Sequence, residues 1–276
     1  MKILITGATG FIGKNLSLKL QKEKIDFKCI IREKSSKEFF LQNAIEFFVF
    51  DNSINSLIKY MKKEKFDGVI HLASLFIAEH KNEQIDDLIS SNILFGTKLL
   101  QACVESDVKW FLNTGTFWQH YNGEAYNPVN LYAATKQAFE DMAKYYSEAF
   151  GLKFVTLKLN DTYGEGDTRR KIFAIWEQIA KTGETLDMSK GEQYIDIVHI
   201  SKVVDAYMIL IDKLQNDTLD KNKISFYVTS GENITLKELA KRYELANGVK
   251  LNINWGGREY RKREFMKPMS CGERIL

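Results

Sequence analysis

Short hydrophobic runs alternate along this chain with longer stretches of helical spacing. The first run, residues 2–6, is largely apolar and ends at a glycine, which is typical of a strand buried on both faces. The stretch after it, residues 14–24, has apolar side chains at Leu16, Leu18 and Leu20 and is interpreted as a helix. Regular alternation of this kind predicts an α/β fold of the Rossmann type, with a doubly wound parallel sheet and ligands outside the carboxyl ends of its strands. The expected strands are 2–6, 27–31, 45–50, 68–72, 110–112, 154–159, 191–199 and 226–228; the expected helices are 14–24, 56–64, 92–104, one around Tyr132, 171–181, 201–214 and 236–246, the last with Thr235 and Glu238 as a capping box.

A glycine-rich turn, Gly7-x-x-Gly10-x-x-Gly13, joins the first strand to the first helix. Glycines there permit a tight turn and a close approach of the backbone, and the helix N-terminus offers free N–H groups to a pyrophosphate. The order strand, glycine turn, helix favours a dinucleotide site over the alternative, a structural turn with no ligand. The candidate contacts in this turn are Gly7, Thr9, Gly10, Phe11, Ile12 and Gly13.

The second strand ends at Arg32, about 20 residues after the glycine turn, where a fold that selects NAD carries an acid for the ribose hydroxyls. An arginine at this point suits a 2′-phosphate, so NADP is favoured over NAD. Two alternatives remain: Glu33 could take the role of the acid, or Arg32 could be a solvated strand end. The candidate contacts to the adenosine half of the cofactor are Arg32, Ser35, Lys37 and, at the end of the third strand, Asp51.

Tyr132 and Lys136 are four residues apart among good helix formers, so a helix places them on one face. An ammonium beside a phenol lowers the pKa of the phenol from about 10, and such a tyrosine can exchange a proton with a carbonyl or alcohol. Thr116 follows the fifth strand, where its hydroxyl can point into the crevice or simply cap a turn. His71, on an apolar strand, is better explained as a core histidine than as a catalyst.

Composition excludes several classes of protein. The chain has 276 residues, 45% of them hydrophobic and 27% charged, with a net charge of +3 and scattered lysines, which does not favour a nucleic-acid partner. Its three cysteines are far apart, so neither a metal site nor a disulfide framework is expected, and a reducing cytoplasm is the natural compartment. No apolar run approaches the roughly 20 residues that span a bilayer, and no signal peptide is visible, so no membrane association is expected.

Taken together, the motifs make the chain resemble, over essentially its whole length, the extended short-chain dehydrogenase/reductases that act on nucleotide sugars. Within that branch, residues 113–118, 191–193 and 236–239 are most similar to the 4-ketoreductases of deoxysugar biosynthesis, such as the CDP-abequose and CDP-paratose synthases. The matching pieces are the glycine turn, His71-Leu72-Ala73, Asn92 with Gly96-Thr97, Thr116, Tyr132-x-x-x-Lys136, Tyr163-Gly164-x-Gly166 and Asp196 with His199.

The resemblance implies an NADPH-dependent reduction of the C4 keto group of a 4-keto-6-deoxyhexose carried on dTDP or CDP, in deoxysugar and surface polysaccharide biosynthesis. Tyr132 would protonate the sugar O4, Lys136 would hold the nicotinamide ribose and Thr116 would hydrogen-bond the same oxygen. Residues 1–160 would form the dinucleotide-binding domain, with some later segments returning to it, and residues 161–276 would form mainly a smaller substrate-binding lobe. The implied cofactor contacts are Leu72, Ala73, Ser74, Asn92, Tyr132 and Lys136, with Asn92 more structural than chemical; the implied substrate contacts are Thr116, Phe117, Trp118, Asp161, Lys171, Arg261 and Arg263.

Two positions depart from the pattern of that family: Ile195 stands where many relatives have an arginine, and Asp161 where they have an asparagine. A phosphate contact is therefore either missing or provided instead by Arg261 or Arg263, in a basic segment that could otherwise be a solvated tail. The resemblance also implies a homodimer formed through the helices that bear Asn92 and Tyr132. Two other functions are open: a 4-epimerase that uses the same triad with tightly bound NAD, and a non-catalytic NADP-binding redox sensor, whose mark would be loss of the Tyr/Lys pair that this chain retains.

Overall fold

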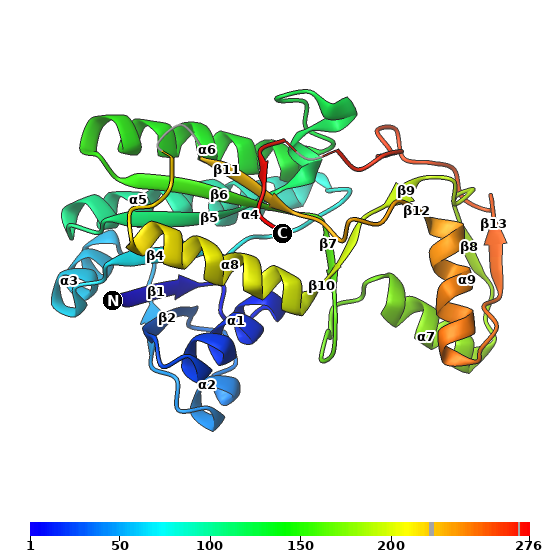
Figure 1. The fold of residues 1–276 in the computed structure, drawn as a ribbon, viewed down its shortest axis with the longest axis horizontal. Coiled ribbons are helices and arrows are strands. Elements are labelled where there is room, and N and C mark those ends of the chain that lie inside the picture. Colours follow the sequence, from blue (N-terminus) through cyan, green and yellow to red (C-terminus); the bar gives the residue numbers. More distant parts are fainter. Residues whose placement is uncertain (221–223, 270) are drawn as a thin grey trace.

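An eight-stranded sheet runs through the larger part of the molecule, with helices on both of its faces (Figure 1). The computed structural model describes residues 1–220, 224–269 and 271–276. The strands of this sheet are β1 (Lys2–Thr6), β2 (Asp26–Arg32), β3 (Phe47–Phe50), β4 (Gly68–His71), β5 (Trp110–Thr116), β6 (Lys153–Leu159), β11 (Ser225–Val228) and β14 (Glu273–Arg274). Their order is β14-β11-β6-β5-β4-β1-β2-β3, and all neighbours are parallel. This confirms the predicted doubly wound Rossmann-type sheet, whose strand order reverses between β1 and β4.

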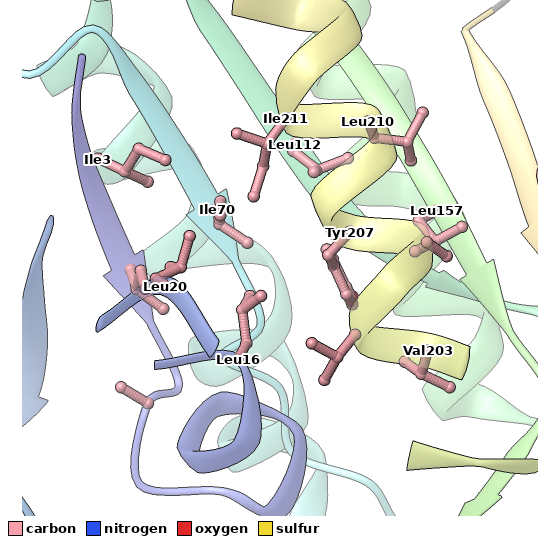
Figure 2. Packing of buried hydrophobic residues seen from close by; sticks show 14 of the residues in the cluster. Ile3, Leu16, Leu20, Ile70, Leu112, Leu157, Val203, Tyr207, Leu210 and Ile211 are labelled. Carbon is pink, nitrogen blue, oxygen red and sulfur yellow. The ribbon is translucent and has the colours of Figure 1, made fainter. Parts of the chain in front are cut away.

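Helices bury their apolar stripes on the two faces of the sheet. One face carries α1 (Phe11–Lys22), α2 (Glu38–Gln42) and α8 (Ile200–Gln215); the other carries α3 (Ile54–Glu64), α5 (Phe95–Glu105) and α6 (Leu131–Phe150). Figure 2 shows the first face, where Leu16 of α1 and Tyr207 of α8 approach side chains such as Ile70 and Leu112 of the sheet. Each fully buried side chain of this size stabilises the fold by about 1.5–3 kcal/mol. Two apolar cores therefore pack against the sheet and position its carboxyl edge.

A smaller lobe stands beyond the carboxyl edge of the sheet (Figure 1). Its own core includes Trp176, Leu239 and Leu251. The lobe contains α7 (Ile172–Thr182), β8 (Leu186–Met188), α9 (Leu236–Asn247) and β13 (Ile253–Trp255), with β8 and β13 paired in parallel. Two small strand pairs lie between the lobe and the sheet: β7 (Asp161–Tyr163) with β10 (Ile197–His199), and β9 (Tyr194–Ile195) with β12 (Ile234–Thr235). The chain then returns through β11 and β14 to the large sheet.

One predicted strand, 191–199, is wrong as a single element, because it is broken at Asp196 into β9 and β10. The Asp196 carboxylate accepts hydrogen bonds from Ser230 N (2.8 Å) and Oγ (2.5 Å) and from Asn160 Nδ2 (2.5 Å), so it anchors the chain where the strand breaks. Another strand, expected over 110–112, continues to Thr116. The capping box of Thr235 and Glu238 at the start of α9 is confirmed.

Several short elements were not expected, because they carry too few residues to show a period. These are α2, the helix α4 (Ile85–Ile89), the π-helical turn η2 (Ser90–Leu94) and the 3-10 turns η1 (Asn82–Gln84), η3 (Phe117–Gln119) and η4 (Tyr121–Gly123). The helix predicted over 92–104 accordingly begins earlier, as a continuous run through α4, η2 and α5. π-Helical turns occur often at functional sites, and this one carries Asn92.

Candidate active site

The glycine turn has the shape that the sequence predicts. Gly7 has φ +72°, and a Cβ there would lie 2.5 Å from Ala73 N, while a Cβ at Gly13 would lie 2.4 Å from Gly7 O. Gly10 is exposed and stands directly before α1, and no side chain in the described part of the chain caps that helix. The first N–H groups of α1 are therefore left for an anion, and the turn has the form that a dinucleotide pyrophosphate requires.

The residues predicted to contact the adenosine half lie at the carboxyl ends of β2 and β3. Arg32 is exposed at the end of β2, and its carbonyl accepts a hydrogen bond from Ser35 N (2.9 Å). Within the described residues, neither Arg32 nor Lys37 has a carboxylate within 4.0 Å, so both cations are open to a phosphate. Asp51 instead holds the start of α3, accepting from Ser53 N (2.9 Å) and Ser56 Oγ (2.5 Å), which lowers the pKa of its carboxyl group.

Lys136 is a buried ammonium on the inner face of α6, with 1% of its surface exposed. Its Nζ makes no hydrogen bond or ion pair with residues 1–220, 224–269 or 271–276. Burial lowers the pKa of Lys136 to about 8, and the charge of Glu140 acts in the opposite direction. A buried cation without a partner is costly, so the site suits a bound group that brings hydroxyl oxygens, as the ribose of a dinucleotide does.

Tyr132 lies one helical turn before Lys136, near the start of α6. Burial raises the pKa of Tyr132 to about 12, although its ring stays partly exposed, and a hydrogen bond with Ser74 opposes the rise. The prediction that Lys136 lowers the pKa of this phenol is therefore wrong for the structure, because burial has the largest effect and Lys136 is not among the groups that shift this pKa. The phenol keeps its proton at neutral pH, which is the state that a proton donor needs.

Thr116 is the last residue of β5 and caps η3: its Oγ1 accepts from Trp118 N (3.3 Å), and its own N donates to Gln119 Oε1 (3.0 Å). The capping role that the pattern left open is thus present. The Thr116 hydroxyl donates no hydrogen bond to any residue that the structure describes, so its hydrogen is available to a substrate oxygen.

Asn92 ties the loop after β4 to α6. Its amide nitrogen donates to Leu75 O (3.0 Å) and Thr135 Oγ1 (2.9 Å), and its oxygen accepts from Leu75 N (2.7 Å) and Ser74 Oγ (3.2 Å). The side chain is buried and its bonds hold Ser74, which in turn lowers the pKa of Tyr132. Asn92 thus has the structural role that was favoured for it; Leu72 and Ala73 lie in the same loop, against Gly7.

His71 is fully buried at the end of β4, with its Nδ1 2.7 Å from Thr6 Oγ1. Burial first, and the charge of Lys136 second, lower the pKa of His71 well below its usual value. It is a neutral core residue, as the sequence favoured.

A cavity of about 690 Å³ lies between the carboxyl edge of the sheet and the smaller lobe. Six of the predicted substrate contacts line it: Phe117, Trp118, Asp161, Lys171, Arg261 and Arg263. Lys171 Nζ lies 2.9 Å from Asp161 Oδ1, so the acid that replaces the family's asparagine is paired. The basic segment is no solvated tail: Arg261 lies 5.9 Å from the Trp118 ring, while Arg263 lies 4.4 Å from the Tyr121 ring and donates to Asn127.

Two residues at the site were missed in the sequence. Phe76, which is 48% exposed, lies 5.0 Å from the Tyr132 ring and 5.4 Å from the Trp118 ring, and so joins the proton donor to the cavity. Arg169, in the loop before α7, lies over the Phe11 ring at 4.5 Å. No motif marks Phe76, but the run of cations at residues 169–171 after a glycine loop was a usable signal for Arg169.

Other chemistry is sparse in the part of the chain that is described. No group of three or more His, Cys, Asp or Glu side chains there is arranged to hold a metal ion. None of the helices described is both long enough and apolar enough to cross a membrane. Cys29 and Cys103 are buried, and burial raises the pKa of the Cys29 thiol to about 12, which makes it a poor nucleophile.

The fold and the site define a dinucleotide-dependent enzyme of the short-chain dehydrogenase/reductase type. The NAD dependent epimerase/dehydratase family matches residues 3–222, and the chain belongs to this family. It is 26% identical to the CDP-abequose synthase of Salmonella typhimurium, over 96% of this chain and 87% of the relative, and 26% identical to that of Yersinia pseudotuberculosis, over 97% and 92%.

Solved structures agree on the fold. The UDP-glucuronic acid 4-epimerase of Bacillus cereus superimposes with a TM-score of 0.82 at 20% identity, over 98% of this chain and 90% of the other. The UDP-glucose 4-epimerase of Thermus thermophilus gives a TM-score of 0.80 at 21% identity, over 99% and 91%. Both of these structures contain NAD.

Proposed function

We propose that this enzyme uses NADPH to reduce the C4 keto group of a 4-keto-6-deoxyhexose carried on CDP or dTDP. The observation that carries the proposal is the pair of a protonated Tyr132 and an unpartnered, buried Lys136 beside a glycine turn shaped for a dinucleotide. Similarity to CDP-abequose synthases over nearly the whole chain supports a reductase of deoxysugar biosynthesis. The class of substrate fits the cavity, where Lys171, Arg261 and Arg263 provide cations for a diphosphate.

The residues of the chain divide the work. When bound, the reduced nicotinamide supplies the hydride. Tyr132 donates its proton to the carbonyl oxygen, and Thr116 donates a hydrogen bond to the same atom. Lys136 would hold the nicotinamide ribose through its free N–H donors. Ser74, held by Asn92, acts on the same phenol and opposes the effect of burial on its pKa.

The preference for NADP follows from the free cations at the end of β2. Arg32 and Lys37 have no carboxylate partner within the described residues, and Ser35 lies between them in the loop. A 2′-phosphate would satisfy both cations, whereas a ribose diol would satisfy neither. We place the enzyme in the cytoplasm, where nucleotide sugars and NADPH are available, and expect it to act as a homodimer.

A 4-epimerase is the second candidate, because the structures quoted above are 4-epimerases with the same fold. Such an enzyme would use the same tyrosine and lysine but keep NAD bound and return the hydride to the other face of the sugar. Purified protein incubated with NADPH and a panel of 4-keto-6-deoxy nucleotide sugars distinguishes the two. We expect stoichiometric oxidation of NADPH and a 4-hydroxy product; tightly bound NAD, with interconversion of 4-hydroxy sugars and no NADPH consumed, would instead establish the epimerase.

A further inference from the structure

Arg169 links the smaller lobe to the first turn of α1. It lies in the loop between β7 and α7, far from the glycine turn in sequence, and its guanidinium carbon is 4.5 Å from the centre of the Phe11 ring. Phe11 is the first residue of α1, directly after Gly10. The loop thus brings a cation onto the side chain of the residue that begins α1.

One edge of this guanidinium is held firmly. Nε lies 2.7 Å from Asp167 Oδ1, and Nη2 donates to Asp167 Oδ2 (2.7 Å), to Thr162 O (2.9 Å) and to Thr162 Oγ1 (3.0 Å). Thr162 is buried in β7, so the orientation of the guanidinium plane is fixed by contacts with the protein. An arginine fixed in this way loses little entropy when its remaining donors bind a ligand.

The other edge is free. Nη1 has no hydrogen-bond partner among the residues that the structure describes, and the side chain keeps 32% of its surface exposed. If Arg169 had a purely structural role, the contacts of Nε and Nη2 would be sufficient for it, and Nη1 would have no function. Two N–H donors on a fixed, charged plane beside an uncapped helix N-terminus match the geometry of a phosphate.

We propose that Arg169 is a cofactor-binding residue whose Nη1 edge contacts the pyrophosphate of the dinucleotide above Phe11. The inference rests on the proposed dinucleotide-dependent function and adds a contact made by the substrate lobe. Because the pyrophosphate is common to both cofactors, Arg169 strengthens the binding of NADPH and NADH equally, unlike Arg32. Arg169 also lines the large cavity, so the diphosphate of the sugar nucleotide is the competing source of the same chemistry.

The test compares Arg169→Ala with Arg170→Ala, which removes an exposed neighbour with no partner in the described chain. Dissociation constants for NADPH and NADH are measured by energy transfer from tryptophan to the reduced nicotinamide, and those for CDP and dTDP by calorimetry. In Arg169→Ala we expect both cofactors to bind about tenfold to a hundredfold more weakly, while CDP and dTDP change less than about twofold. Arg170→Ala should bind all four ligands as the wild type does.

Arg169→Gln, which keeps a planar polar side chain, serves if the alanine variant does not fold; the same weakening of both cofactors is expected. Unchanged cofactor affinity in a folded Arg169 variant would make the residue a strut and overturn the proposal. If Arg169→Ala bound CDP and dTDP more weakly but kept its affinity for both cofactors, Arg169 would contact the diphosphate of the sugar nucleotide. That result would also overturn the proposal. Wild-type protein that binds neither NADPH nor NADH would instead refute the proposed function itself, and this inference with it.

Discussion

At the scale of single residues, the site is built around a phenol that keeps its proton. Tyr132 has a pKa raised by burial to about 12, and Ser74, in the loop after β4, opposes the rise. Tyr132→Phe removes the proton donor and keeps the ring that packs on Phe76. We expect the rate of ketone reduction to fall by about 10²- to 10⁴-fold with nearly unchanged NADPH affinity, measured by steady-state kinetics and fluorescence titration.

Tyr145→Phe is the matched control for this substitution, since Tyr145 lies on the same helix and is 60% exposed. It should retain wild-type turnover. A Tyr132→Phe variant that turns over as fast as the wild type would show that another group, or water, protonates the sugar.

Lys136 gives the enzyme a pH dependence of its own. Its pKa is lowered to about 8 by burial, so the ammonium is present below about pH 8 and is lost as the pH rises through that value. Tyr132 stays protonated over the same range. We therefore expect kcat/KM for NADPH to be constant near pH 7 and to fall above about pH 8, as followed in a pH series at constant ionic strength. A profile that stays flat up to the ordinary lysine pKa of about 10.4 would refute this role for the Lys136 charge.

The motif of tyrosine and lysine could be found in the sequence, but the direction of the phenol's pKa could not. Spacing on a helix depends on local structure, whereas burial depends on what the rest of the chain packs around the side chain. The same reason explains why Phe76 was missed. Its contacts with Tyr132 and Trp118 join three separate segments, and nothing in its own loop indicates them.

At the scale of elements, the end of β2 decides which cofactor fits. Arg32 is exposed there and has no carboxylate partner within the described residues. Arg32→Asp replaces a phosphate ligand by an acid that repels phosphate and accepts from ribose hydroxyls. We expect the ratio of kcat/KM for NADPH to that for NADH to fall by at least about tenfold, with most of the change in KM. Lys34→Asp, which also places an acid at an exposed position, is the control and should leave this ratio unchanged. An unchanged ratio in Arg32→Asp would mean that another element determines the choice of cofactor.

The break between β9 and β10 depends on Asp196, which joins three segments through Ser230 and Asn160. Asp196→Ala removes the acceptor of Ser230 N and Oγ and one of the two acceptors of Asn160 Nδ2, at a position that is 8% exposed. We expect the free energy of unfolding in urea to fall by about 2–4 kcal/mol, while the exposed Asp205→Ala changes it by less than about 0.5 kcal/mol. A loss below about 1 kcal/mol for Asp196→Ala would mean that water replaces the carboxylate at little cost.

Helices and strands long enough to show a hydrophobic pattern could be predicted from the sequence. Elements whose bounds depend on residues distant in the sequence could not. The helices α8 and α9 and the strands β1 and β6 show their pattern within their own residues. The alternation over 191–199 continues straight through Asp196, so no local signal marks the break, which depends on residues more than thirty positions away. The positions of Arg261 and Arg263 on the cavity wall likewise follow from how the last segment packs on Trp118 and Tyr121.

At the scale of the whole molecule, several large apolar side chains are exposed on neighbouring helices of the Rossmann part. Exposed large side chains gather on α4, η2 and α6, which contact one another: Ile85, Ile89, Leu94, Met142, Tyr145 and Phe150. Thr97 Oγ1 lies 3.1 Å from Met142 Sδ, so the residues after η2 and the middle of α6 meet at this surface. Exposed apolar side chains on helices that contact one another are expected where a protein interface forms. The second copy of the chain that the family resemblance implies would cover this surface through the same helices.

We therefore expect a homodimer that is disrupted by charge at the centre of this surface. Leu94→Glu combined with Met142→Lys places buried charges in an interface that otherwise gains from apolar burial, so the complex should become a monomer in light scattering and sedimentation. Leu245→Lys is the control, because Leu245 is 84% exposed on α9, in the other lobe, and it should leave the dimer intact. Cofactor affinity shows whether the double variant is folded. The glycine turn and Lys136 belong to the same chain, so a folded monomer should still bind the cofactor. A wild-type chain that is monomeric at about 10 μM, roughly the upper limit for a weak specific complex, would show that the apolar surface has another purpose.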